Sequence, residues 1–150
     1  MPEIVCFVGL PASGKTTMYK TRFAETHVHV SKDNFRSNKD RKGRQAQLIE
    51  EAFADGKNVV VDNTNASLEE RQQVIDLAKK HGAKLVCYNF MTDVDGCLER
   101  NAQRSGKAFV PKVGMLSVAK RLVRPTKDEG FDEMYVVKPI GGTEFSIEIA

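Results

Sequence analysis

Residues 9–17 read GLPASGKTT, and the apolar run IVCFV at residues 4–8 directly precedes them. The pattern is a complete GxxxxGKT phosphate-binding loop, which has meaning only between a buried strand and the first turn of a helix. In such a loop, glycines let backbone amides curl around phosphates, a lysine supplies a compact positive charge and a threonine hydroxyl joins a Mg²⁺ shell. The stretch therefore predicts a site for ATP or another nucleoside triphosphate.

Each position of this loop has an expected role. Lys15 is expected to contact the β- and γ-phosphates, and Thr16 to order Mg²⁺ together with water and phosphate oxygens. A chance glycine-rich turn is the alternative, but two glycines, a lysine and a threonine at the required positions argue against it. The other predicted nucleotide contacts of the loop are Gly9, Pro11, Ala12, Ser13, Gly14 and Thr17.

The length and composition indicate one intracellular domain. A chain of 150 residues can bury a core without disulfides or metals. Three scattered cysteines argue against a disulfide framework and favour a reducing cytoplasm. No apolar stretch reaches the roughly 20 residues that span a bilayer, and no signal-peptide layout begins the chain, so no membrane contact is expected. The net charge of +3 does not mark a general nucleic-acid binder, although it allows a local basic groove.

Strand-like and helical patterns alternate along the chain, which is typical of βαβ units and a parallel sheet with helices on both faces. The strands are expected over residues 3–8, 27–30, 57–61, 84–91 and 134–138, with a weak final run near 145–149. The helices are expected over residues 14–24, 44–55, 67–81, 94–105 and 112–123. We therefore expect an α/β fold of the P-loop, adenylate-kinase-like type. It would be a three-layer sandwich with a central parallel sheet of four to five strands and a small helical lid over about residues 100–124.

Three chemically rich stretches follow the expected strands. SKDNFR at residues 31–36 follows the second strand, DNTN at residues 62–65 follows the third, and a helix with Arg100 and Arg104 follows the fourth. In an open parallel sheet, ligands gather beyond the carboxyl ends of the strands. We therefore expect all three stretches to face the phosphate loop.

Asp33 is the best candidate for the carboxylate that phosphoryl transfer requires near the attacking hydroxyl. Its alternative role is a helix N-cap, which is compatible with the first. Arg36, three residues on, could share a face with Asp33 and bind a substrate phosphate. The basic cluster that runs from Arg36 to Arg44 is usually a solvated stretch, but it could also line an acceptor groove.

Two further stretches have both a functional and a structural interpretation. Arg100 and Arg104 are one helical turn apart, so they would point to one side and close on the donor phosphates; an exposed, salt-bridged helix face is the alternative. Asp62 could reach Mg²⁺ through water, as a carboxylate at the end of a buried strand. Equally, Asp62, Asn63 and Asn65 could be turn residues that satisfy their own backbone.

Together these motifs resemble the 5′-kinase domain of polynucleotide kinases, the end-healing enzymes of DNA and RNA repair, over nearly the whole chain. The matching stretches are GLPASGKT, SKDNFR, DNTN, the RNxxR pattern at residues 100–104 and PTKDEGF at residues 125–131. The resemblance implies that Asp33 activates a 5′-hydroxyl, that Arg36 contacts the acceptor's 3′-phosphate, and that Lys15 and Arg104 bind the donor phosphates. The remaining substrate-side candidates are Lys32, Asp62, Asn63, Thr64 and Asn65.

The chain departs from the family pattern in three ways. Phage-type members carry an arginine where Lys32 stands, and a lysine lacks bidentate phosphate recognition. They carry DTN where this chain has Asn63, Thr64 and Asn65, which leaves Asp62 as the candidate for the acidic role. The phosphatase domain fused in many relatives is expected to be absent, so separate 3′-phosphatase or ligase chains would complete the repair.

Two rival functions remain on the sequence. The first is a P-loop kinase of a small molecule such as a nucleoside, a sugar or an antibiotic, because the DNTN and lid motifs are loosely shared with such enzymes. The second is a non-catalytic nucleotide switch. Asp33 argues against the switch, since a switch has no need of a carboxylate aimed at an acceptor.

Overall fold

The computed structural model describes residues 2–91, 93–141 and 144–150, which build one sheet of six strands in the order β2-β3-β1-β4-β5-β6. The first five strands run parallel and β6 runs antiparallel to β5. The expected α/β fold with a mostly parallel central sheet is confirmed. The strands are β1 Glu3–Val8, β2 His27–Val30, β3 Asn58–Asp62, β4 Lys84–Phe90, β5 Glu133–Gly141 and β6 Glu144–Ile149.

The last strand reverses direction because only two residues separate it from β5. A parallel neighbour would need a crossover connection of a dozen or more residues, so a connection this short permits only an antiparallel partner. The sequence predicts the existence of this strand at residues 145–149, and the structure adds its direction.

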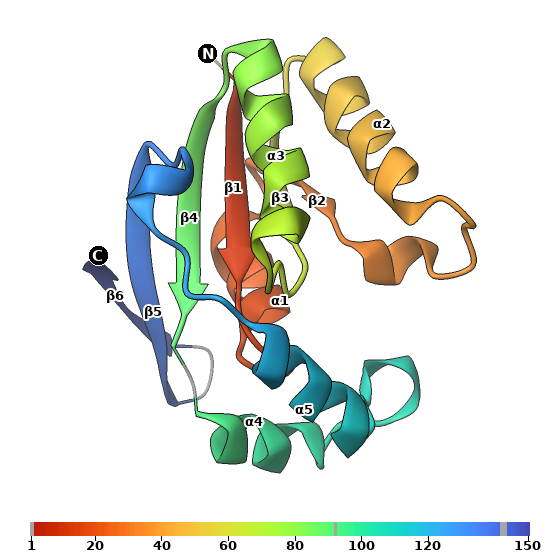
Figure 1. Ribbon diagram of the computed structural model, residues 1–150, viewed down its shortest axis with the longest axis vertical. Coiled ribbons are helices and arrows are strands. Elements are labelled where there is room, and N and C mark those ends of the chain that lie inside the picture. The colour runs from red at the N-terminus through yellow and green to blue at the C-terminus, as the bar shows by residue number, and fades with distance from the viewer. Residues whose placement is uncertain (1, 92, 142–143) are drawn as a thin grey trace.

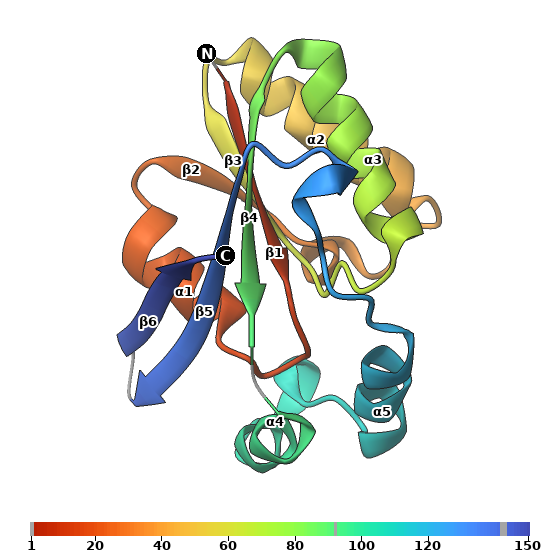
Figure 2. The ribbon, with the colours of Figure 1, turned by 60° about the vertical axis from the view of Figure 1, so that its left-hand side comes forward.

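The helices surround the sheet in the expected layers. Figures 1 and 2 show α2 and α3 on one face, α1 on the other, and α4 and α5 beyond the carboxyl ends of the strands. The described residues include no helix that is long and apolar enough to cross a membrane. The bounds are α1 Lys15–Met18, continued by a π-helical turn Tyr19–Phe23, then α2 Arg41–Ala54, α3 Leu68–His81, α4 Val94–Asn101 and α5 Lys112–Arg121. Three 3₁₀ turns lie at Lys32–Phe35, Gly106–Ala108 and Lys127–Glu129.

Strand β1 lies at the centre of the core. Alternate side chains along it point to opposite faces of the sheet. Ile4, Cys6 and Val8 join the cluster that includes α2 and α3 residues, whereas Val5 and Phe7 join the cluster on the α1 face. Because both faces are covered, the strand reads as one apolar run, and the phosphate loop that follows it starts from a fully buried support.

The helix expected over residues 94–105 is too long, because α4 ends at Asn101. The Asn101 side chain turns back to Val110: its Nδ2 donates to the Val110 carbonyl at 2.6 Å, and its Oδ1 accepts from the Val110 amide at 3.0 Å. This two-way pairing closes the segment between α4 and α5 into a loop. The expected lid region is therefore two short helices with a loop between them.

Helix α2 begins three residues earlier than expected. The Asp40 carboxylate accepts a hydrogen bond from the Gly43 amide at 2.9 Å and so caps a first turn that starts at Arg41. The ends of α3 follow the sequence more closely: Ser67 Oγ accepts from the Glu70 amide, and Gly82 ends the helix in the left-handed region.

A buried ion pair links α3, the loop after β3 and the turn at Lys127–Glu129. Arg71 on α3 is 0% exposed, and its guanidinium donates to both carboxylate oxygens of Glu129 at 2.7 and 3.3 Å. The same guanidinium donates to the carbonyls of Asn65 and Ala66, in the loop that follows β3. Glu129 also accepts from the Thr126 amide at 2.6 Å. One charged pair thus fastens the turn at Lys127–Glu129 to α3 and to the β3–α3 loop.

We expect Arg71→Ala to lower the free energy of unfolding by about 3–5 kcal/mol, because it leaves the Glu129 carboxylate without its buried partner. The double change of Arg71 and Glu129 to Met should be less damaging, since no uncompensated charge remains. Lys80→Ala is the matched control, because its pair with Glu50 is exposed and contributes little to stability. Urea unfolding measures all three, and equal losses in the two single variants would contradict this account.

Candidate active site

The phosphate loop is a tightly packed turn between β1 and α1. Gly14 has φ 102° and Ala12 φ 63°, so the chain passes twice through the left-handed region. A Cβ at Gly9 would stand 2.9 Å from both Phe90 Cβ and Ser13 Oγ, which excludes any side chain there. The glycine spacing therefore follows from packing as well as from phosphate binding.

Lys15 lies across the mouth of this loop. Its Nζ donates to the carbonyls of Gly9 at 2.9 Å and Leu10 at 2.6 Å. Burial lowers the pKa of the Lys15 ammonium to about 8; the charge of Asp62 opposes this shift, Arg104 adds to it and Asp33 opposes it. Side chains from β3, from the segment after β2 and from the lid loop therefore act on one ammonium group.

Asp62, at the end of β3, makes the most direct link between the loop and the neighbouring strand. Its Oδ2 accepts a hydrogen bond from Thr16 Oγ1 at 2.9 Å, and Asp62 is only 4% exposed. The same oxygen lies 2.7 Å from His29 Nε2, and the Tyr19 ring stacks on His29 with centroids 4.2 Å apart. His29 is a site residue that the sequence interpretation missed. The available signal was its alternation with Val28 and Val30 on the strand adjacent to β3.

The next three residues fasten neighbouring backbone segments. Asn63 Oδ1 accepts from the Lys32 amide at 2.9 Å, and the Thr64 carbonyl accepts from the Gly9 amide at 3.0 Å. Asn65, at φ 45°, donates from Nδ2 to the Phe7 carbonyl at 2.7 Å. The sequence left ligand contact and turn chemistry open for this stretch. In the structure these residues hold the phosphate loop and the segment after β2 in place.

A relay of side-chain amides connects the Lys32 segment to the start of α2. Asn63 Nδ2 donates to Gln45 Oε1 at 2.7 Å, Gln45 Nε2 donates to Gln73 Oε1 at 2.7 Å, and Gln73 Nε2 donates to the Lys42 carbonyl at 2.8 Å. Gln45 is 1% exposed. No sequence pattern marks Gln45 or Gln73, because a lone glutamine on a helix has no motif around it.

Asp33 lies at the open end of this arrangement. Ser31, and not Asp33, caps the 3₁₀ turn, because Ser31 Oγ accepts from the Asp33 amide at 3.3 Å. The N-cap role for Asp33 is therefore wrong. Its side chain is 74% exposed, and its Oδ1 lies 3.3 Å from Arg36 Nη2, as expected for residues three apart on one face.

The two lid arginines occupy different positions. Arg100, on α4, donates from Nε to the Ala12 carbonyl at 2.7 Å and so contacts the phosphate loop directly. Arg104 lies beyond the end of α4, and its Nη1 donates to the Ala108 carbonyl at 3.2 Å. The expectation that both share one face of a helix is wrong, because the Asn101 pairing ends the helix between them.

The donor set at the loop is suited to magnesium. The Thr16 hydroxyl and the Asp62 carboxylate are hard oxygen ligands 2.9 Å apart. Mg²⁺ in nucleotide sites usually takes only one or two protein oxygens and completes its shell with water and phosphate. The described residues hold no cluster of three or more His, Cys, Asp or Glu able to bind a metal by themselves.

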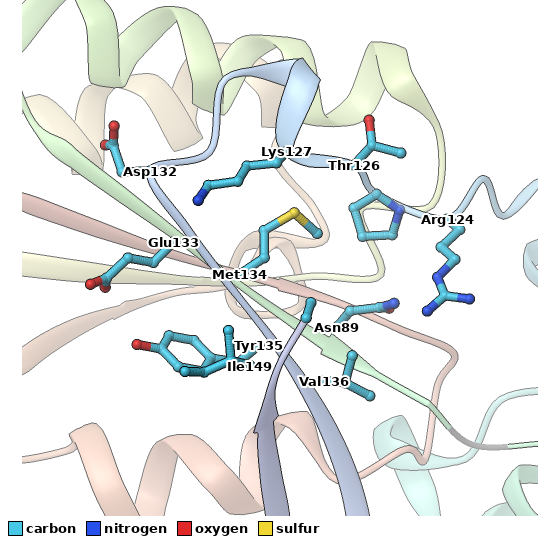
Figure 3. Close-up of a pocket in the computed structure, with 12 residues that line it drawn as sticks. Asn89, Arg124, Thr126, Lys127, Asp132, Glu133, Met134, Tyr135, Val136 and Ile149 are labelled. Atoms are coloured by element: carbon cyan, nitrogen blue, oxygen red, sulfur yellow. The ribbon is translucent and has the colours of Figure 1, made fainter.

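Two cavities open along the α5 side of β5, and they share Asn89 and Arg124. One of about 510 Å³ extends to Leu10 of the phosphate loop. The other, of about 370 Å³, lies around the start of β5; Figure 3 shows its lining side chains on β5, β6 and the segment 124–127. Neither is lined by Lys15 or Asp33. Asp33 instead lies on the open surface and Lys15 is buried at the phosphate loop, both beyond the strand ends, where parallel sheets bind ligands.

A phosphate loop after a buried strand, with a carboxylate hydrogen-bonded to its threonine and Arg100 at its rim, is the arrangement of a P-loop nucleotide-binding domain. Residues 4–124 match the family described as AAA domain, and the chain belongs to that family.

Two curated relatives match most of this chain. The chain is 31% identical over 133 residues to a bifunctional polynucleotide phosphatase/kinase from Schizosaccharomyces pombe, with 86% of this chain and 32% of that protein covered. A second relative so described, from Acanthamoeba polyphaga mimivirus, is 29% identical over 144 residues, with 90% of this chain and 33% of that protein covered. The chain therefore spans about a third of the length of these relatives.

Solved structures share the fold. Kti12 from Chaetomium thermophilum, in complex with ADP-AlF3, has a TM-score of 0.76 at 17% identity, with 90% of this chain and 88% of that chain covered. A fungal RNA kinase has a TM-score of 0.70 at 19% identity, over 92% and 38% of the two chains. A gluconokinase from Sinorhizobium meliloti 1021 has a TM-score of 0.64 at 19% identity, over 95% and 85%. At these identities the likeness shows the fold alone, and it includes kinases of unlike acceptors.

We expect Gln45→Leu to lower the free energy of unfolding by about 1–3 kcal/mol, because it leaves the amides of Asn63 and Gln73 without their buried partner. Gln72→Leu is the matched control on α3, since the Gln72 amide is exposed and donates to Asp76, one turn along the same helix. Thermal unfolding with circular dichroism measures both variants. A change for Gln45→Leu no larger than for Gln72→Leu would show that the relay contributes nothing.

Proposed function

We propose that this chain is a polynucleotide 5′-hydroxyl kinase that transfers the γ-phosphate of ATP, or another nucleoside triphosphate, to the 5′-OH end of DNA or RNA during nucleic-acid repair. The observation that carries the proposal is the Asp33–Arg36 pair, a carboxylate and a guanidinium 3.3 Å apart at the open end of β2. It combines a proton acceptor with a phosphate-binding group on the side of the sheet that holds the phosphate loop. The polynucleotide phosphatase/kinase relatives support the choice of acceptor.

In the proposed acceptor half, Asp33 takes the proton of the 5′-hydroxyl as its oxygen attacks the γ-phosphorus. One oxygen–phosphorus bond forms, the bond from the γ-phosphorus to the bridging oxygen breaks, and the nucleoside diphosphate leaves with that electron pair. Arg36 binds the acceptor's 3′-phosphate and orients the hydroxyl. Lys32, fixed through its amide by Asn63, adds a second positive charge beside the acceptor.

In the proposed donor half, the amides of residues 9–17 cradle the β- and γ-phosphates, and Lys15 exchanges its carbonyl partners for phosphate oxygens. Arg100 is already hydrogen-bonded to the loop, so it lies where it can meet the donor phosphates. Arg104 closes on them from the lid loop and offsets the charge of the transferring group. When bound, Mg²⁺ would be held by Thr16 and, through water, by Asp62, and it would neutralise phosphate charge.

A small-molecule kinase is the second candidate. One support is the fold likeness to a gluconokinase over 95% of this chain. The other is that the exposed Asp33 carboxylate could equally accept the proton of a sugar hydroxyl. The two candidates share the donor half and differ only in what meets Asp33 and Arg36. The acceptor therefore decides between them.

An acceptor panel tests the proposal. The protein is incubated with γ-labelled ATP and Mg²⁺, and label is followed on 5′-hydroxyl oligonucleotides, 3′-nucleotides, nucleosides and sugars. We expect label on the oligonucleotide 5′ ends. Label confined to sugars or nucleosides would refute the polynucleotide assignment and favour the second candidate.

We expect Asp33→Asn to retain nucleotide binding and lose about 10²–10⁴-fold in transfer rate, because the hydroxyl proton loses its acceptor. Lys15→Ala should impair both binding and transfer. Asp40→Asn is the matched control, because it removes another carboxylate of the same segment while asparagine keeps the cap of α2. Titration with a fluorescent nucleotide and single-turnover transfer assays separate the two effects; full transfer by Asp33→Asn would eliminate it as the base.

A further inference from the structure

Positive charge is concentrated beside Asp33. Between residues 32 and 44 the chain carries six cationic side chains and two carboxylates, a formal charge of +4 that exceeds the +3 of the whole chain. The remainder of the protein is therefore slightly acidic. Figure 1 shows this segment at the edge of the molecule beyond β2, with α2 leading away from it.

Most of these cations are exposed and have no carboxylate partner. Within the described ranges, Lys39, Arg41, Lys42 and Arg44 form no ion pair, whereas Lys80, Lys84 and Arg121 elsewhere on the surface each pair with a glutamate. Of the two acids of the segment, Asp33 pairs with Arg36 and Asp40 caps α2. Unneutralised cations at this density repel one another, and a polyanion would relieve the repulsion.

The segment is held in register with the acceptor turn. The amide relay joins the Lys42 carbonyl, through Gln73, Gln45 and Asn63, to the Lys32 amide. Electrostatics indicate the same proximity: burial lowers the pKa of the Lys32 ammonium, Glu70 opposes the shift, and the like charges of Arg41 and Lys42 add to it. The first turn of α2 is thus fixed beside the residues that would receive the acceptor.

We propose that residues 36–44, the basic arm, bind the phosphate backbone of the acceptor strand downstream of the 5′ end that Asp33 receives. This inference rests on the proposed function and extends it from a 5′ end to a length of strand. Lysines and arginines that contact only phosphates carry no base information, so the arm would bind strands of any sequence. A mononucleotide would reach Arg36 alone, whereas a longer strand would also engage Arg41 and Lys42.

The arm predicts that acceptor affinity rises with strand length and falls with salt. For a single strand, log affinity falls with log salt concentration with a slope of about −0.7 for each phosphate contact. One contact therefore corresponds to about a fivefold difference in affinity between 1 M and 0.1 M salt. The double variant Arg41→Gln/Lys42→Gln should therefore raise KM for a strand of about twelve nucleotides roughly 20-fold and lower the salt slope by about 1.4. The preference for that strand over a dinucleotide should shrink by the same factor.

The matched control is Lys57→Gln/Lys79→Gln, which removes the same charge from exposed positions at the other end of the strands. Its KM and salt slope should equal those of the unmodified protein. Circular dichroism confirms folding, and fluorescence anisotropy with a labelled 5′-hydroxyl strand and ADP measures binding without turnover.

The outcomes separate the two proposals. If the unmodified protein phosphorylates no 5′-hydroxyl strand, the proposed function fails. If it does so and Arg41→Gln/Lys42→Gln keeps the same length and salt dependence, or the control pair loses as much, the basic arm is overturned while the kinase assignment remains.

Discussion

The parallel pairing of β1 and β3 is the constraint on which the site depends. In this register Phe7 stands opposite Asp62, so the residues that follow the two strands leave the sheet side by side. The Asp62 carboxylate then reaches Thr16, the Thr64 carbonyl reaches the Gly9 amide and Asn65 reaches the Phe7 carbonyl. A slip of one residue would turn Asp62 to the other face of the sheet and break these contacts together.

The two halves of the proposed site are held by different means. The donor half rests on strand pairing and on a loop whose glycines leave no free space. The acceptor half depends on side-chain amides that meet only when α2 and α3 are both packed on the sheet. Such a network is worth most when every member is satisfied, because its buried groups have no access to water. The acceptor segment is therefore more sensitive to remote substitutions on α2 and α3 than the phosphate loop is.

The sequence predicts the features that depend on neighbouring residues. It does not predict those that depend on a contact with a residue far along the chain. The phosphate loop, the alternation of strands and helices and the end of α3 at Gly82 follow from spacing and backbone preference within a few residues. The end of α4 does not, because it is set by the pairing of Asn101 with Val110 across a loop. His29 and Gln45 were missed for the same reason. Nothing in the sequence around them marks either residue, because His29 meets Asp62 33 positions away and Gln45 meets Asn63 18 positions away.

Strand β6 gives the donor site an unexpected dependence on the far end of the chain. A Cβ on Gly14 would stand 2.8 Å from the Phe145 ring, which leaves no room for a side chain at Gly14. Phe145 packs with β1 and α1 residues in one cluster. The family match ends at residue 124, so the packing of Phe145 against the phosphate loop lies outside the matched residues. During synthesis the phosphate loop is made well before β6, so its packing is completed only after Phe145 has followed. A nascent chain that has already made every loop residue still lacks the finished nucleotide site until residue 145 has emerged.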